Sequence, residues 1–210
     1  LEGIVAAYKS LKELINKHSR KKDFSDEIVM KDRFGAEGVY VYKYESNAYT
    51  KILAKVNEHK NISLIIQPLV NFDKGFRFKN LYVSADIRLI YFGEKVIQTY
   101  IRIAKDGDFR CNEHQGGSLI YISKSKVPNG VMNLAENIVK ILNKKNSLYT
   151  LDFVISNNGN PYLLEGNTSP GLDWNLSIKE NEKEAKKLIR IIVKELVTRT
   201  RSTVPNFTSS

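Results

Sequence analysis

The strongest constraint on the fold is a predicted β-hairpin in the last third of the chain. Residues 148–156 and 161–165 are rich in apolar and aromatic side chains, and the run Asn-Asn-Gly-Asn stands between them at 157–160. Asn and Gly tolerate positive φ, so this run is typical of a tight turn. The segment therefore predicts two antiparallel strands joined by that turn.

The same hairpin brings two carboxylates together. Side chains alternate across a strand, so Glu165 is expected on one face with Leu163 and Asn167, and strand pairing places Asp152 beside it. Two carboxylates and an amide oxygen are hard ligands that suit Mg²⁺. The alternative is that both carboxylates are solvated on a polar strand edge. The Gly-Asn-Thr-Ser-Pro-Gly run at 166–171 favours the metal site.

The first part of the chain predicts a small α+β lobe. Apolar side chains recur at helical spacing near the N-terminus, which indicates an amphipathic helix. Two short β-prone runs then flank a turn that contains glycine, which is typical of a hairpin with a flexible tip. The expected elements are helices at 1–18 and 47–58 and strands at 28–31, 38–43 and 62–67.

The remainder predicts a larger α+β lobe. Two long strands, 81–91 and 95–104, are joined by a tight turn, and Pro128 opens a helix that reaches about residue 143. A last amphipathic helix covers 177–198. The buried faces expected for the two helices are Val131, Leu134, Ile138, Ile141 and Leu142 in the first, and Leu188, Ile191, Ile192 and Leu196 in the second.

These patterns predict a domain organisation and a setting for the chain. We expect a small lobe over residues 1–70, a large lobe over 71–200 and a flexible tail over 201–210. The single cysteine, Cys111, excludes a disulfide framework and a four-cysteine metal site, so a reducing, cytoplasmic setting is expected. No apolar run approaches the roughly 20 residues that span a bilayer, and no membrane partner is expected.

The net charge narrows the range of partners. The chain carries 33 Lys and Arg against 23 Asp and Glu, a formal charge of +10. Residues 51–150 hold most of this excess, which favours an anionic partner such as a nucleotide phosphate or nucleic acid. Translation of an AT-rich genome explains a lysine-rich composition equally well, so charge alone does not decide the function.

Several motifs follow one another along residues 26–174. Lys31 stands before Gly35 and Gly38, and then come the strand Gln67-Pro68-Leu69-Val70, Arg88 and Arg102 on paired strands, and Asn112 before a double glycine. The last motif is an Asp separated by twelve residues from Glu-Gly-Asn-Thr-Ser-Pro-Gly-Leu. Together these motifs resemble the ATP-grasp superfamily, within it the carboxylate–amine ligases of the ribosomal-protein glutamate ligase and glutathione synthetase type.

The resemblance implies an α+β fold in which two lobes with antiparallel sheets clasp ATP, with the glycine hairpin as a lid. It implies that Lys31, Gly35, Gly38 and Arg88 contact phosphates, that residues 67–70 hold adenine, and that Arg102, Lys31 and Asn112 act in catalysis. Asp152, Glu165 and Asn167 would hold one or two Mg²⁺, with Mn²⁺ as a substitute. The implied reaction joins a small-molecule or peptide carboxylate to an amine through an acyl phosphate and releases ADP.

Other interpretations of these residues stay open at the level of sequence. Lys31 is also typical of a surface lysine on a hairpin and Asn112 of a turn. Either Arg88 or Arg102 could instead be a cross-strand ion-pair partner, for instance to Asp86. At the level of function, the alternatives are a nucleotide- or nucleic-acid-binding module without ligase chemistry, and a phosphotransferase of the same fold. Nucleic acid is the less expected partner. Members of the family usually have a preceding α/β domain, so an upstream domain or a second copy of the chain is expected to contribute.

Overall fold

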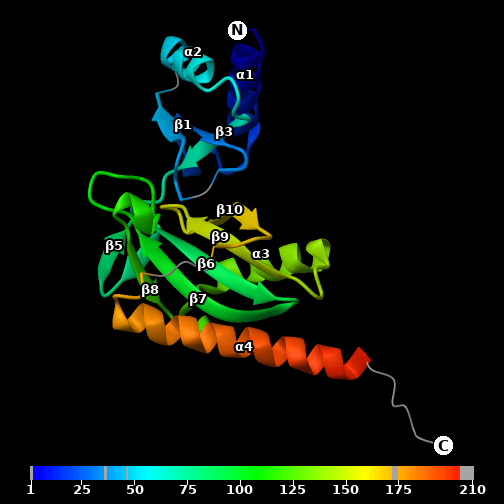
Figure 1. Cartoon of the computed structure of the whole chain (residues 1–210). Coiled ribbons are helices and arrows are strands. Elements are labelled where there is room, and N and C mark those ends of the chain that lie inside the picture. The colour runs from blue at the N-terminus through cyan, green and yellow to red at the C-terminus, as the bar shows by residue number, and fades with distance from the viewer. Residues whose placement is uncertain (1, 36, 46, 172–174, 204–210) are drawn as a thin grey trace, which may run out of the picture.

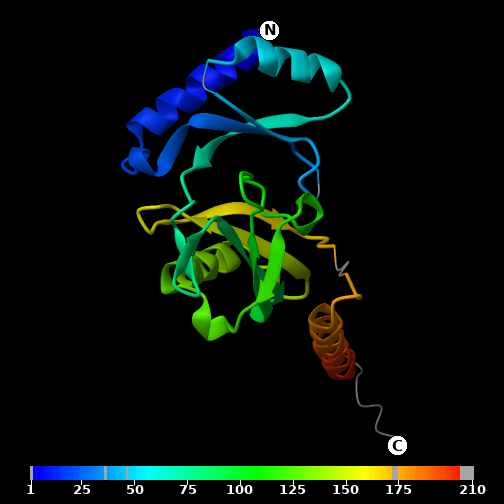
Figure 2. The ribbon, with the colours of Figure 1, turned by 90° about the vertical axis from the view of Figure 1, so that its left-hand side faces the viewer.

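The computed structural model of the chain describes residues 2–35, 37–45, 47–171 and 175–203. Its elements form two groups, which we call the small lobe and the large lobe. The small lobe consists of α1 (Glu2–Lys17), η1 (Lys21–Asp23), β1 (Phe24–Asp32), β2 (Val41–Tyr44), α2 (Tyr49–Glu58) and β3 (Leu64–Val70). The two lobes lie one above the other in both views (Figures 1 and 2).

The small lobe is a three-stranded antiparallel sheet, in the order β2-β1-β3, covered by α1 and α2. Alternation along β1 sends Ile28 and Met30 into the core beneath these helices, where they pack with Tyr8 and Ile52. The intervening residues of β1 face the other way, toward the large lobe. This alternation is what places Lys31 in the space between the lobes.

The large lobe is built on a five-stranded antiparallel sheet in the order β10-β9-β6-β7-β8. A separate two-stranded hairpin, β4 with β5, packs beside it. The elements are β4 (Phe76–Phe78), β5 (Leu81–Val83), β6 (Ala85–Phe92), β7 (Lys95–Ile103), η2 (Glu113–Gln115), β8 (Ser118–Tyr121), η3 (Lys124–Lys126), α3 (Asn129–Leu142), β9 (Leu148–Ile155), β10 (Pro161–Asn167) and α4 (Lys179–Thr203).

The two faces of the five-stranded sheet have different partners. One face packs against α3 through the main hydrophobic core, which includes Ile87, Leu151 and Phe153. The opposite face is covered by α4 near Ile90 and Leu188. Figure 2 shows the two helices on opposite sides of the sheet. The rest of this second face lies toward the small lobe and carries the charged residues described below.

The expected hairpins form, with two changes in detail. Residues 28–31 lie in β1 and pair antiparallel with β2, which begins at Val41 rather than at 38 as expected. The turn at 157–160 joins the antiparallel strands β9 and β10. The expectation of one long strand over 81–91 is wrong, because Ser84 separates two strands, β5 and β6. Strand β5 pairs with β4 in a separate hairpin, and only β6 enters the main sheet.

The helices also differ from expectation at their ends. Val131, Ala135 and Val139 form the buried face of α3, whereas Ile141 and Leu142, in its last turn, are 82% and 40% exposed. In α4, Leu188 is buried against the sheet, whereas Leu196 is half exposed. Helix α4 continues to Thr203, so the tail expected from 201 is helical over its first three residues, and 204–210 lie outside the described residues. No helix of the described part is long and apolar enough to cross a membrane.

Candidate active site

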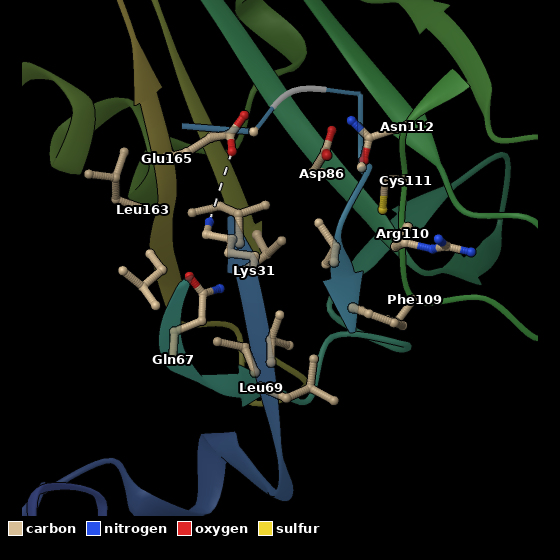
Figure 3. A pocket seen from close by; sticks show the side chains of 18 of the residues that line it. Lys31, Gln67, Leu69, Asp86, Phe109, Arg110, Cys111, Asn112, Leu163 and Glu165 are labelled. Carbon is tan, nitrogen blue, oxygen red and sulfur yellow. Dashed lines mark ion pairs between the residues drawn. The ribbon is translucent and has the colours of Figure 1, made fainter. Parts of the chain in front are cut away.

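A cleft of about 660 Å³ lies between the two lobes. Its small-lobe wall consists of β1, β3 and the β1–β2 loop. Its large-lobe wall consists of β10, the end of β9 and the segment 109–112. Figure 3 shows side chains from both walls around the open space. The cleft therefore draws on segments from residue 24 to residue 168, which only the folded chain brings together.

Lys31 and Glu165 face each other across this cleft (Figure 3). Lys31 Nζ lies 4.0 Å from Glu165 Oε2, and Arg88 Nη2 lies 3.6 Å from Glu165 Oε1. The Glu165 side chain is 41% exposed, so it remains accessible from the cleft. The lysine of one lobe and the carboxylate of the other thus form an ion pair across the gap.

Beneath Glu165 lies a buried network of arginines and aspartates on the sheet. Arg88 binds Asp152 at two points, from Nε to Oδ1 at 2.7 Å and from Nη2 to Oδ2 at 2.5 Å. Arg102 binds Asp86 at two points, at 2.8 and 2.7 Å, and also donates to Asp152 Oδ2 at 2.8 Å. Two-point pairing is the strong form of the arginine–carboxylate interaction. The network therefore holds both guanidinium groups in fixed positions.

The charges of this cluster balance. Burial is the largest influence on the pKa of Glu165 and raises it, and the neighbouring Asp152 raises it further. The pKa of Asp152 itself is lowered, because Arg102 and Arg88 outweigh the effect of its burial. Three cations face three carboxylates: Lys31, Arg88 and Arg102 against Asp86, Asp152 and Glu165. An added cation gains little attraction here unless an anion accompanies it.

The predicted lid meets the large lobe in this structure. Gly38 has a φ of +73°, and a Cβ on it would lie 2.9 Å from Asn112 Oδ1, so the close approach requires glycine. Gln115 Nε2 donates to the carbonyl of Glu37 at 3.1 Å. Gly35 also lines the cleft, while Ala36 lies outside the described residues. Lid and large lobe are therefore in contact at Asn112.

The predicted adenine strand forms the opposite part of the small-lobe wall. Gln67, Pro68, Leu69 and Val70 all belong to β3 and line the cleft. Strand β3 is an edge strand, paired only with β1, so a proline within it costs no ladder hydrogen bond on the open side. The open edge leaves backbone groups of β3 available to a ligand.

Most of the predicted site residues converge on this cleft. Those that line it are Lys31, Gly35, Gly38, Gln67, Pro68, Leu69, Val70, Arg102, Asn112, Glu165 and Asn167. Arg88 and Asp152 lie just below, paired with each other rather than exposed to the cleft. Of the two arginines considered as ion-pair partners of Asp86, Arg102 forms that pair, whereas Arg88 pairs with Asp152.

Sequence reasoning identified Asp86 only as an ion-pair partner, and the structure also places it in the wall of the cleft. It stands directly opposite Arg102 in the β6–β7 register and binds it. Sequence reasoning missed Phe24 and Tyr162, which contribute a pair of aromatic rings to the cleft, with centroids 5.3 Å apart. These two residues come from different lobes, and no sequence signal connected them.

Cys111 lines the cleft but is buried and lacks the properties of a nucleophile. Burial is the main cause that raises the pKa of its thiol, so the reactive thiolate is disfavoured. Its Sγ contacts the carbonyl of Ser84 at 3.8 Å. Cys111 is therefore a small buried residue of the cleft wall rather than a catalytic thiol.

The oxygens of the predicted metal site differ in accessibility. Within the described residues, no three His, Cys, Asp or Glu side chains cluster as a metal site. The predicted set includes an amide: Asn167 Oδ1 accepts a hydrogen bond from Ser169 N–H, and Glu165 is accessible from the cleft. The Asp152 side chain has no exposed surface, and Arg88 donates to its Oδ1. Glu165 and Asn167 therefore offer accessible oxygens of the kind that Mg²⁺ prefers, whereas Asp152 is enclosed by its arginine partners.

Two antiparallel lobes with a nucleotide-sized cleft between them define a class of fold. The solved structure of D-alanine–D-alanine ligase from Bacillus anthracis in complex with ATP superposes with a TM-score of 0.54 at 18% identity, over 89% of this chain and 58% of that one. A second structure of that ligase gives a TM-score of 0.53 over 84% of this chain and 56% of that one. The fold is the ATP-grasp fold.

Sequence comparison then identifies the family. Residues 2–192 match the model of the RimK-like ATP-grasp domain, and the chain belongs to this family. A probable alpha-L-glutamate ligase of Vibrio parahaemolyticus is 32% identical over 146 residues, and one of Legionella pneumophila is 29% identical over the same length. Each alignment covers 70% of this chain but only 44% and 43% of the relatives. The chain thus spans less than half the length of these curated relatives.

Proposed function

We propose that this chain carries the ATP site of an ADP-forming carboxylate–amine ligase. The observation that carries the proposal is the convergence of Lys31, Arg102, Asn112 and Glu165, from four separate segments, on one cleft between two lobes of an ATP-grasp fold. A surface lysine or a turn asparagine would have no reason to meet the other residues. The alternative of a module without chemistry has no comparable observation in its favour.

The nucleotide is proposed to lie along the cleft with its base at β3. The open edge of β3 at Gln67 to Val70 offers backbone hydrogen bonds and apolar surface, which suit adenine. Lys31, which faces Glu165 across the cleft, would neutralise phosphate charge. Backbone N–H groups of the lid near Gly35 and Gly38 would contact phosphate oxygens. We also propose that the lobes divide at residue 70, where β3 ends.

Glu165, Asn167 and Asp152 are the residues that would hold Mg²⁺, one ion or two. When bound, the metal would supply charge neutralisation at the phosphates. Because the cluster is already balanced, the cation is expected to enter together with the nucleotide. Arg88 would then keep Asp152 ionised and oriented rather than bind phosphate itself.

The proposed reaction proceeds in two steps. A carboxylate oxygen of the substrate attacks the γ-phosphorus, the bond from that phosphorus to the β–γ bridging oxygen breaks, and ADP leaves with the electron pair. The amine nitrogen then attacks the acyl carbon, the bond from that carbon to the phosphate oxygen breaks, inorganic phosphate leaves with the electron pair, and the nitrogen gives a proton to the departing phosphate. Lys31 and Arg102 would stabilise charge that moves with the phosphoryl group. Closure of the lid on Asn112 would exclude water from the acyl phosphate.

The substrates are proposed from the relatives. Because the curated relatives are named probable alpha-L-glutamate ligases, we propose an amino acid, with glutamate first, as one of the joined substrates. The carboxylate partner would be a small molecule or a peptide. We propose that a further part of the protein, or a second copy of the chain, helps to bind these substrates. We also propose that the reaction takes place in the cytoplasm.

Thermal unfolding with nucleotide tests the ATP site. Mg-ADP at about 100 times its dissociation constant should add roughly 2.7 kcal/mol of stability, which raises Tm by several degrees. Mg²⁺ alone should leave Tm unchanged, because the cluster carries no excess negative charge. A ligand-independent Tm would refute nucleotide binding by this chain. Phosphate release with glutamate and candidate acids then tests the ligase chemistry.

A further inference from the structure

The lobes are also joined by a polar contact outside the charged cluster. Asp23, the last residue of η1, is only 2% exposed. Its carboxylate accepts three hydrogen bonds from the β9–β10 hairpin: from Asn158 Nδ2 at 2.7 Å, from Asn160 Nδ2 at 2.8 Å and from Tyr162 Oη at 2.6 Å. A carboxylate of the small lobe is thus held by three side chains of the large lobe.

Backbone hydrogen bonds continue this contact into the connection between the lobes. The carbonyl of Asp23 accepts from Asn71 N–H at 2.8 Å, and the carbonyl of Asn71 accepts from Asn157 N–H at 2.7 Å. Asn71 directly follows β3, where the chain leaves the small lobe. Three segments far apart in sequence therefore meet at one point, which we call the hinge network: Asp23, Asn71 and the turn at 157–160 with Tyr162.

The hinge network is mechanically connected to the active site. Tyr162 lies three residues before Glu165 on β10, and its ring packs edge-on against Phe24, which begins β1. Lys31 lies further along the same strand β1. Strand β10 carries Tyr162 and Glu165, and strand β1, which directly follows Asp23, carries Lys31. A displacement of the β9–β10 turn relative to Asp23 would therefore move Glu165 relative to Lys31.

The energetics make the hinge network cooperative. Burial alone raises the pKa of Asp23, but its hydrogen bonds from Tyr162, Asn158 and Asn160 outweigh this and lower the pKa. Burial and the bond to Asp23 in turn raise the pKa of Tyr162 to about 12, which keeps its hydroxyl protonated as a donor. Loss of the donors would leave a buried charge unsatisfied, which is costly. The network therefore favours one relative position of the lobes.

We propose that Asp23 is a positioning residue that fixes the separation of Lys31 and Glu165 across the cleft by tying the small lobe to the β9–β10 turn. Its consequence for ATP rests on the proposed function above. The tie itself can be measured without any nucleotide, so the two proposals can fail separately.

Distances between the lobes test the tie directly. Spin labels on cysteines introduced at the exposed positions Lys60 and Lys140, one in each lobe, report the separation by pulsed electron paramagnetic resonance. Cys111 is 5% exposed and should not be labelled. The parent should give one narrow distance distribution, and Asp23→Ala should at least double its width. An unchanged distribution in this variant would overturn the proposal.

A matched control is available within the same region. The Asp73 carboxylate also accepts from Asn157, at 2.7 Å, but it is exposed and lies beyond β3. Asp73→Ala should leave the width unchanged, and equal broadening in both variants would contradict a specific role of Asp23. If Asp23→Ala does not fold, a double variant with Asn158→Ala and Asn160→Ala removes two donors from the opposite side. It must then show the same broadening.

Nucleotide affinity tests the consequence for the site. Calorimetric titration with Mg-ADP should give a dissociation constant about tenfold higher for Asp23→Ala than for the parent, and an unchanged one for Asp73→Ala. Broadened distances with unchanged affinity would overturn the positioning role. A parent chain that binds no Mg-ADP would refute the proposed function, and the distance distributions would then decide the tie alone.

Discussion

Arg88 and Asp152 lie directly opposite each other on strands β6 and β9 and form a two-point ion pair, with Nε to Oδ1 at 2.7 Å. The Asp152 side chain has no exposed surface, and Arg102 binds its Oδ2 as well. This carboxylate is thus the point at which two buried cations meet. Asp152, expected from the sequence to bind metal, therefore also holds together the ion pairs on the sheet.

Asp152→Asn should destabilise the protein strongly. The amide removes the negative charge and leaves Arg88 and Arg102 with one buried carboxylate fewer, which typically costs about 3 kcal/mol or more. Urea unfolding at neutral pH measures the loss. As a control, Asp108→Asn breaks a partly exposed pair with Arg110 and should cost less than about 1 kcal/mol. Similar losses in the two variants would contradict the central role of Asp152.

Glu165→Gln should separate stability from ligand binding. The raised pKa of Glu165 means that the folded state prefers its protonated form. Its contribution to stability is therefore present below the unfolded pKa, about 4.3, and is lost as pH rises through the folded pKa. Because glutamine stays neutral, the variant should be as stable as the parent at pH 4 and slightly more stable at pH 7.

Denaturant unfolding of Glu165→Gln at the two pH values measures this difference, which partial exposure keeps small. The same variant should lose the rise in Tm with Mg-ADP. A variant that is less stable than the parent at pH 7, or that keeps the full rise, would contradict the respective half of this prediction.

Lys31→Ala should weaken nucleotide binding more than folding. A charge-assisted contact to phosphate is typically worth about 2 kcal/mol, or roughly thirtyfold in the dissociation constant. Titration with Mg-ADP measures the affinity. Lys51→Ala, on the exposed surface of α2, removes the same charge from the same lobe and should leave the affinity unchanged. Equal affinities in the two variants would move the phosphate role to another cation.

Gly38→Ala should slow turnover by disturbing the lid. The new Cβ would lie 2.9 Å from Asn112 Oδ1, and the φ of +73° strains any other residue. Gly107→Ala is the matched control, since its φ is +79° but nothing lies within 4 Å of its Cβ. Both variants should lose similar stability, whereas only Gly38→Ala should reduce ATP turnover, by roughly tenfold. Equal turnover would show that contact of the lid with Asn112 is unimportant.

Local sequence patterns predict the hairpins, the main helices and most of the residues that line the cleft. Turn formation and strand alternation depend on neighbouring residues alone. They therefore predict that Lys31 and Glu165 lie near the ends of strands and that Asn112 lies in a loop. The combination of motifs also indicated the family, which the comparisons confirm. Helix ends were less accurate, because the position of the sheet edge decides how much of α3 and α4 is covered.

The pairing of the charged residues, by contrast, depends on long-range strand register. Bulges interrupt β9–β10 between Leu163 and Glu165, and β6–β7 between Ile90 and Tyr91. The first interrupts the alternation expected from Leu163 to Glu165 and sets Glu165 opposite Asp152 instead of a core residue. A shift of one residue moves a side chain to the other face of a sheet, and a bulge depends on long-range packing rather than on local pattern. The partners of Arg88 and Asp23, distant in sequence, were fixed for the same reason, because each depends on a register between segments that local chemistry does not encode.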